Sequence, residues 1–240
     1  MGVTGTGTVG VPRSVLADTL LERLTVTYAA AADPERAGPM RAYMKDVAPF
    51  LGLTTPVRRA LSRTVVAGTA RPDEADCTAV AQRCWQLPER EYHYFAVDYL
   101  RRHVGRCSSA FLSVARQLVT TVSWWDTVDL IAAHVVGALV ASDPGLKRDM
   151  DAWIVDDDLW VARTALLHQL RYRERTDTER LFTYCLRQSG HPDFFVRKAI
   201  GWCLREYAKT DPEAVWAFLA REGGRFAPLS VREALKNIGA

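Results

Sequence analysis

Two stretches of the sequence match each other at a distance of 35 residues: Asp158-Leu-Trp-Val-Ala-Arg-Thr-Ala165 and Asp193-Phe-Phe-Val-Arg-Lys-Ala-Ile200. The alignment superposes Val161 on Val196, and one further step of the same length reaches Val231. In each case a turn residue precedes the valine by a few positions, and a basic residue and an alanine follow it. A pattern that recurs at this interval indicates a chain built from a repeated unit of structure.

The rest of the chain has the pattern of helices. Apolar residues recur three and four positions apart in segments 15–24, 79–84 and 111–119, which is the spacing of one helix face. Proline-containing turns separate such segments, and strand-like alternation never extends beyond a few residues. Because a single helical hairpin is too thin to bury its apolar face, neighbouring hairpins must stack. The sequence predicts an all-α, right-handed superhelical solenoid of HEAT-like helical hairpins with about twelve helices. An irregular helical bundle is the alternative.

Length and composition agree with an ordinary folded protein. The chain has 240 residues, of which 48% are hydrophobic and 25% charged, and this excludes a wholly disordered chain. A membrane-spanning helix is not expected, because no run long enough to cross a bilayer is apolar throughout. The most apolar stretch, 130–141, is predicted to form a buried helix. No linker divides the chain, so we expect one domain over residues 15–240 after a flexible extension, residues 1–14.

The cysteine and histidine residues predict neither a cofactor nor a metal site. The five cysteines form no CxxC pair, and the five histidines form no ligand cluster. A metal at Asp156-Asp-Asp158 is an alternative, but three acids before a helix more often stabilise its N-terminal end. The N-terminus lacks the basic start and long apolar core of a secretory signal. We therefore expect a reduced, cytoplasmic protein that binds no membrane.

Positive charge is concentrated in the last third of the chain. The formal net charge is only +3, but residues 158–240 hold 14 Lys and Arg against 10 Asp and Glu. The preceding residues hold 17 and 18, so the whole excess lies in the C-terminal part. Helices often carry charged residues on a solvated outer face, which is the alternative interpretation. The distribution nevertheless favours a partner with a phosphate backbone.

The most unusual segment is Ser123-Trp-Trp-Asp-Thr-Val-Asp129. If a helix starts at Ser123 or Asp126, Trp125 and Asp129 lie four positions apart on one helix face. An indole ring beside a carboxylate suits a ligand that is cationic or becomes so. The alternative is that both tryptophans belong to the core and that both aspartates cap the helix or lie on the surface. Farther along, Gly201 precedes Trp202, and a missing side chain there would let another helix approach closely.

Several motifs, in this order, resemble the AlkD family of bacterial DNA alkylation repair glycosylases, which are built from HEAT-like helical repeats. The matching segments are residues 33–45, 49–59, 124–129, 160–172 and 194–209. With the residues between them they cover nearly all of the chain after residue 33. The resemblance implies a catalytic aspartate at Asp129, accompanied by Trp125 and Trp202 on either side of the sugar. It also implies DNA contacts by Tyr43 and Arg171.

Three further residues complete the predicted DNA-binding set. The resemblance implies that Arg163, in Val-Ala-Arg-Thr-Ala-Leu-Leu, holds a phosphate with a forked hydrogen bond. Trp124, the first residue of the tryptophan pair, and Lys198, on the next repeat, are the other two.

The resemblance implies a monofunctional glycosylase. Such an enzyme hydrolyses the N-glycosidic bond of cationic alkylated purines in duplex DNA, such as 7-methylguanine and 3-methyladenine, and bulky minor-groove adducts in some relatives. A cationic base leaves as a neutral molecule, so one carboxylate suffices and no general acid is needed. The family is thought to act without base flipping, and we expect a monomer without a cofactor. The alternative, from another class, is a non-catalytic HEAT-type scaffold that binds DNA or protein.

Overall fold

The computed structural model describes residues 13–236, and within this range every regular element is helical. This confirms the all-α prediction. Residues 1–12 of the predicted extension lie outside the described residues, while Ser14 is the N-cap of the first helix, its side chain accepting a hydrogen bond from the Ala17 amide. The α-helices are α1 (Val15–Ala30), α2 (Pro34–Tyr43), α3 (Thr55–Val66), α4 (Glu74–Gln86), α5 (Arg90–His103), α6 (Phe111–Thr120), α7 (Trp125–Ile131), α8 (Gly137–Ser142), α9 (Lys147–Trp153), α10 (Leu159–Leu167), α11 (Thr178–Arg187), α12 (Phe194–Tyr207), α13 (Pro212–Glu222) and α14 (Pro228–Ala234).

Short helical turns complete the described chain. They are η1 (Val104–Arg106), η3 (Pro144–Leu146), η4 (Arg173–Arg175) and η5 (Gly223–Arg225), which are 3-10 turns, and η2 (Ala132–Val136), which is a π-helical turn. The described residues thus hold fourteen α-helices, against the expected number of about twelve. Part of the difference arises because η2 divides the apolar stretch 130–141, which we expected to be one regular helix, between α7 and α8.

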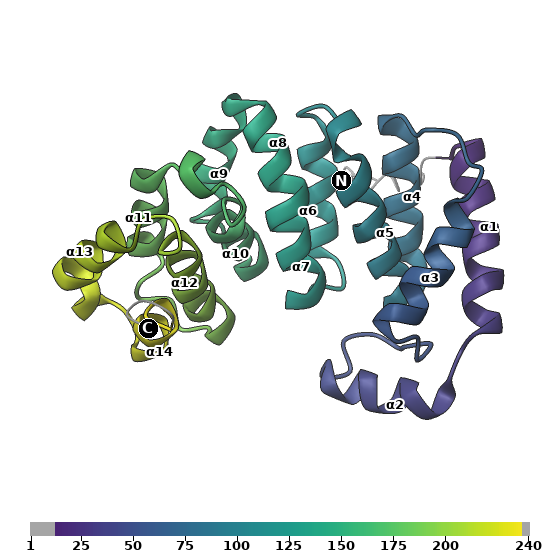
Figure 1. Ribbon diagram of the computed structural model, residues 1–240, viewed down its shortest axis with the longest axis horizontal. Coiled ribbons are helices and arrows are strands. Elements are labelled where there is room, and N and C mark those ends of the chain that lie inside the picture. Colours follow the sequence, from purple (N-terminus) through teal and green to yellow (C-terminus); the bar gives the residue numbers. More distant parts are fainter. Residues whose placement is uncertain (1–12, 237–240) are drawn as a thin grey trace, which may run out of the picture. The chain divides into compact units, whose positions relative to one another are not determined.

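The chain divides into two compact units, Met1–Arg106 (unit 1) and Cys107–Ala240 (unit 2). Figure 1 shows α1 to α5 in purple and blue and α6 to α14 in teal to yellow. The single domain predicted over residues 15–240 and the superhelical arrangement of the hairpins stay predictions.

In unit 1, α1 packs against α3 and α4, and α4 packs against α5. Tyr28 is fully buried there and stacks on Tyr92, with ring centroids 5.7 Å apart. The buried Glu91 carboxylate accepts hydrogen bonds from three successive backbone amides, those of residues 51–53. Because a buried charge needs such partners, Glu91 fixes the loop that leads into α3.

In unit 2, the sequence repeat becomes a series of stacked helices. α10, α12 and α14 begin at residues 159, 194 and 228, and α10 packs on α12, which packs on α14. Val161 and Val196 are both fully buried. Gly201 lies against α14, where an added Cβ would be 2.4 Å from the Glu233 Cβ and 2.6 Å from the Ser230 carbonyl oxygen. This confirms the close approach that we expected at Gly201, and Figure 1 shows α14 beside α12.

The continuous helical run Trp125–Ser142 passes through the core of unit 2. By length and composition alone it could cross a membrane, but 61% of it is buried inside the protein, as in the core helix of a soluble protein. At its π-turn the chain approaches α10: a Cβ on Gly137 would lie 2.2 Å from the His168 carbonyl oxygen. The Tyr172 hydroxyl donates a 2.6 Å hydrogen bond to the Gly137 carbonyl. These contacts fix the loop after α10 against the π-turn.

Candidate active site

The site is built around Asp129, on the second turn of α7. The helix begins directly after Trp124, whose extended backbone places its carbonyl where the amides of Thr127 and Val128 donate to it. Four positions after the first helical residue, Asp129 faces inward and only 8% of it is exposed. A buried carboxylate needs compensation by hydrogen bonds or an opposite charge.

Arg163 on α10 supplies that compensation. Its Nε donates to Asp129 Oδ1 at 2.7 Å and its Nη2 donates to Asp129 Oδ2 at 2.8 Å, a forked pair of charge-assisted hydrogen bonds. The third nitrogen, Nη1, donates to the Phe195 carbonyl on α12. The Arg163 guanidinium group therefore joins three helices, α7, α10 and α12. Asp158 is the N-cap of α10, and its side chain accepts hydrogen bonds from the amides of Trp160 and Val161.

This geometry differs from the phosphate contact expected for Arg163. The residue is only 3% exposed, and each of its three guanidinium nitrogens donates to a protein oxygen. A phosphate ligand would need nitrogens open to solvent. In this structure the Arg163 guanidinium holds the Asp129 carboxylate, and its predicted phosphate contact stays a prediction.

The environment of Asp129 shifts its acidity. Burial raises the pKa of the Asp129 carboxyl above its ordinary value, and the neighbouring Asp126 carboxylate adds to the shift. The hydrogen bonds and positive charge of Arg163 oppose it. The carboxylate is therefore held by one strong cationic partner in surroundings that otherwise favour its neutral form.

Asp129 opens into a cavity of about 490 Å³ that lies wholly within unit 2. Trp202, half-buried on α12, and Arg171, exposed after α10, line the same cavity. The cavity therefore brings together three of the predicted site residues, and a fourth, Arg163, is bonded to Asp129. The other residues that line the cavity are Leu130, Ala133, His134, Leu170, Tyr172, Arg173, Glu174, Arg175 and Glu206.

The tryptophan pair divides between two places. Trp125 is the first residue of α7 and is half-buried, but it does not line the cavity. Trp124 packs into an aromatic cluster, with its ring centroid 4.9 Å from that of Phe195 and 5.8 Å from that of Trp160. Its Nε1 is buried without a hydrogen-bond partner. Trp124 as a whole is half-buried and packs at the start of α7, and its predicted contact with DNA stays a prediction.

The remaining predicted DNA-binding residues are on the surface. Lys198, on α12, is exposed and its Nζ lies 5.5 Å from the centroid of the Phe194 ring. Tyr43, the last residue of α2, is 74% exposed and belongs to unit 1. Both are accessible to a ligand, and neither lines the cavity at Asp129.

The comparison with known proteins decides the family. A family model described as DNA alkylation repair enzyme matches residues 25–238. The chain belongs to the DNA alkylation repair enzyme family. The solved structure of a predicted DNA alkylation repair enzyme from Enterococcus faecalis is 30% identical in sequence, with a TM-score of 0.79 over 87% of this chain and 97% of that one. No curated protein matches the chain.

In this DNA alkylation repair family member, sequence reasoning missed several residues of the cavity. Arg173 and Arg175 lie in the run Arg-Tyr-Arg-Glu-Arg after α10, where the density of arginine was an available signal. Glu206 lies four positions after Trp202, so the two share a face of α12. His134 lies in the π-turn, an irregularity often found at functional sites and not visible in the apolar pattern.

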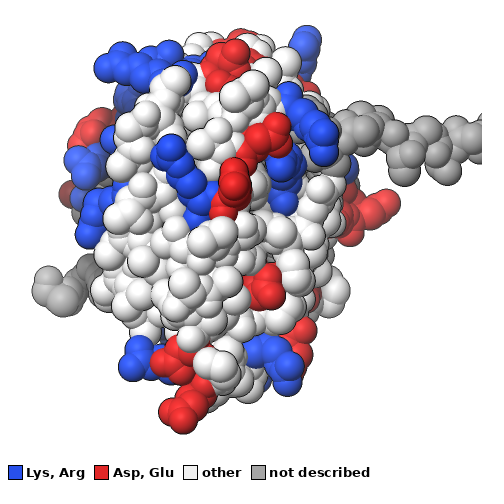
Figure 2. Space-filling view, turned by 90° about the vertical axis from the view of Figure 1, so that its right-hand side faces the viewer, with Lys and Arg blue, Asp and Glu red and all other residues white. Residues whose placement is uncertain are grey.

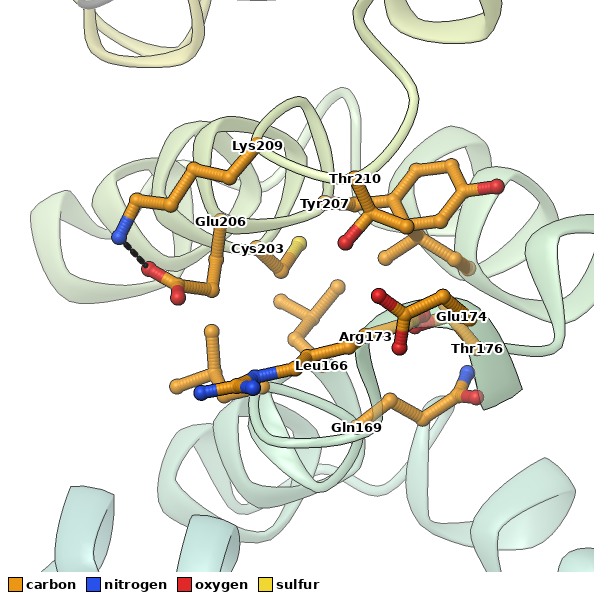
Figure 3. Close-up of a pocket in the computed structure, with 12 residues that line it drawn as sticks. Leu166, Gln169, Arg173, Glu174, Thr176, Cys203, Glu206, Tyr207, Lys209 and Thr210 are labelled. Atoms are coloured by element: carbon orange, nitrogen blue, oxygen red, sulfur yellow. Dashed lines mark hydrogen bonds and ion pairs between the residues drawn. The ribbon is translucent and has the colours of Figure 1, made fainter.

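A second cavity, of about 400 Å³, lies beside the first and shares four lining residues with it: Leu170, Arg173, Glu174 and Glu206. Figure 3 shows Glu206 and Lys209 joined on one side, with Arg173 across from them. The Lys209 Nζ lies 2.6 Å from Glu206 Oε2. The Asp129 cavity is thus adjacent to a second cavity on this side.

Metal-ligating residues do not gather in the part of the chain that the structure describes: it contains no group of three His, Cys, Asp or Glu residues able to hold a metal ion. The acidic run before α10 is occupied by other interactions. Asp156 accepts a 2.6 Å hydrogen bond from Arg116, and Asp158 caps the helix.

Proposed function

We propose that the protein is a monofunctional DNA glycosylase that hydrolyses the N-glycosidic bond of cationic alkylated purines in duplex DNA. Membership of the DNA alkylation repair family supports action on alkylated DNA. The observation that carries the specific reaction is the buried Asp129 carboxylate, held by Arg163 and open to the cavity that Trp202 also lines.

Asp129 would stabilise the charge that develops on the sugar. When the bond between a cationic purine and deoxyribose breaks, the base leaves as a neutral molecule and the positive charge moves to the sugar. A fixed carboxylate in surroundings of low dielectric constant stabilises that charge more strongly than one in water. Two hydrogen bonds from Arg163 use part of the carboxylate's acceptor capacity, and a carboxylate has about four such positions. The remaining capacity can orient the attacking water.

Trp202 and the arginines of the cavity would bind the substrate. The π-face of Trp202 favours a positively charged sugar or base next to it. Arg171, Arg173 and Arg175 are exposed, so their guanidinium groups are available for backbone phosphates. We assign phosphate contacts to these three residues.

Finer features of the proposal follow from the resemblance to the AlkD-type glycosylases. These are activity on 7-methylguanine and 3-methyladenine, cleavage without base flipping, and action as a cytoplasmic monomer without a cofactor. The second cavity beside the Asp129 cavity would give space for bulky minor-groove adducts, which supports their inclusion among the substrates.

The test is release of free base from methylated duplex DNA. We expect 7-methylguanine and 3-methyladenine to appear faster than by spontaneous loss. Asp129→Asn should lower the single-turnover rate constant by about 10²–10³-fold while duplex affinity stays nearly unchanged, because the carboxylate acts mainly in the transition state. Asp126→Asn is the matched control, since Asp126 lies on the same helix outside the cavity and should retain activity.

Release at the spontaneous rate, in a reaction where a known glycosylase is active, would refute the enzymatic function. Duplex binding without release would then favour the non-catalytic scaffold. Equal activity of the Asp129→Asn and Asp126→Asn variants would remove Asp129 from the mechanism.

A further inference from the structure

Unit 1 contains a cavity of its own, of about 430 Å³, formed by the ends of α3 and α5, η1 and the loop before α4. Four arginines from these four segments line it: Arg63, Arg71, Arg102 and Arg106. All four are exposed, so their charged groups are accessible to a ligand. The convergence of four guanidinium groups from separate segments is a property of the folded unit and not of a single basic run.

Within the described residues, these four arginines have no acidic partner, unlike four other arginines of unit 1 that form ion pairs. Elsewhere in unit 1 the ion pairs include Arg36 with Asp33, Arg41 with Asp46, Arg58 with Asp98 and Arg83 with Asp18. The face on which α1 lies, shown in Figure 2, likewise carries acidic and basic side chains together.

The carboxylate that lines the cavity is already in use. Asp98 Oδ2 accepts a 2.8 Å hydrogen bond from Arg58 Nη1, and Arg58 is buried. Asp98 therefore neutralises a buried arginine rather than the four exposed ones. The lining keeps an excess of positive charge that an anion could offset.

The interior of the cavity is aromatic and is affected by the same charges. The ring of His103 lies 4.7 Å from that of Tyr99, and both residues line the cavity together with Phe95. Burial lowers the pKa of His103, and the positive charges of Arg102 and Arg106 lower it further. The arginine charges thus act on groups inside the hollow and not only on solvent.

We propose that this cavity is a second binding site that takes a phosphate group. Arginine forks match the geometry of phosphate oxygens, and phosphate is the common anion that can use several forks at once. The cavity volume lies in the range of small-ligand sites, and its mixture of a few charged groups with aromatic walls is typical of them. The phosphate comes either from a nucleic-acid backbone or from a free phosphorylated molecule. No residue of unit 2 takes part, so this site does not rest on the proposed glycosylase function.

The experiment compares two double variants of the full chain that carry the same charge. Arg63→Gln/Arg102→Gln removes two cavity arginines, and Arg59→Gln/Arg101→Gln removes two exposed arginines from the same helices outside the cavity. Binding of inorganic pyrophosphate and of a short undamaged DNA duplex is measured by calorimetry, the duplex at several salt concentrations. Thermal melting verifies that each variant is folded. Arg71→Gln/Arg106→Gln is a second cavity variant should the first unfold.

We expect the cavity variant to lose at least about tenfold in affinity for one of the two probes, while the control stays near the wild type. Loss with pyrophosphate alone identifies a free phosphorylated ligand. Loss with the duplex, accompanied by a decrease of about 0.9 per lost contact in the salt slope, identifies a backbone phosphate. Equal binding by cavity and control variants with both probes would overturn the proposal, whether or not the protein excises bases.

Discussion

Replacing Arg163 by methionine tests the role of the central ion pair. The substitution keeps much of the apolar stem but removes the two hydrogen bonds to Asp129 and the one to the Phe195 carbonyl. It leaves a carboxyl group that is only 8% exposed without its cation. Loss of one partner from a buried pair costs about 3–5 kcal/mol, so we expect a decrease of that size in the unfolding free energy at neutral pH.

The loss should depend on pH in a specific direction. Without Arg163, burial raises the pKa of Asp129 in the folded protein with no nearby cation to oppose it. A carboxyl group whose pKa is higher in the folded state destabilises the fold as pH rises from its unfolded pKa, about 3.9, to its folded pKa. Near about pH 3 the group is largely protonated in both states, and only lost hydrogen bonds of about 1–2 kcal/mol remain.

Urea unfolding followed by tryptophan fluorescence measures this loss. Six of the seven tryptophans lie in unit 2, so the signal reports the unit that holds the pair. Arg116→Met is the matched control, because Arg116 is paired with Asp156 at 2.6 Å but its side chain is 45% exposed. An exposed pair of this kind contributes about 0–1 kcal/mol. Equal losses for Arg163→Met at neutral and acidic pH, or a loss no larger than that of the control, would refute the reasoning.

Three further predictions concern acidity and packing. Burial raises the pKa of Asp129, so kcat/KM for base excision should begin to fall on acidification at a pH above about 3.9, the pKa of an exposed aspartate. The pH profile is measured with spontaneous base release subtracted, and a profile that stays flat down to about pH 3.9 contradicts this. Gly201→Ala should lower the unfolding free energy by about 1–3 kcal/mol, since the new Cβ would lie 2.4 Å from the Glu233 Cβ; an unchanged melting temperature contradicts this. Burial alone would raise the pKa of Asp177, but hydrogen bonds from Lys147 and then from the Arg180 amide and side chain lower it to about 2. Asp177 therefore stabilises the fold above its unfolded pKa and loses this effect as pH falls. Asp177→Asn keeps a helix-capping residue and should cost about 2 kcal/mol at neutral pH, a cost that shrinks as pH falls from about 3.9 towards 2; a loss independent of pH contradicts this.

The helical repeat could be predicted because its signals are local. Val161 and Val196 are buried at equivalent places of α10 and α12, and Asp158 and Asp193 cap these helices. Such positions depend on residues within one turn, so a period in the sequence becomes a period in the structure. The resemblance likewise indicated Asp129, which the structure places in the same cavity as Trp202.

The direction of Arg163 could not be predicted in this way. An arginine on a helix can reach outward to a phosphate or inward to a carboxylate, and the choice depends on a partner 34 residues away in the chain. The backbone conformation after α10 could not be predicted from the sequence pattern either. Arg173 adopts a positive φ of 52°, which is unusual for a residue other than glycine.

The link between α7 and α10 limits how the site can be transferred or divided. Asp129 belongs to one helix, while the cation that holds it belongs to another that begins 30 residues later. A segment grafted with the tryptophan pair and Asp129 alone would carry the carboxylate without the group that opposes its neutralisation. Moving this hydrogen-bonded arrangement into another helical-repeat protein therefore requires α7, α10 and the start of α12 together.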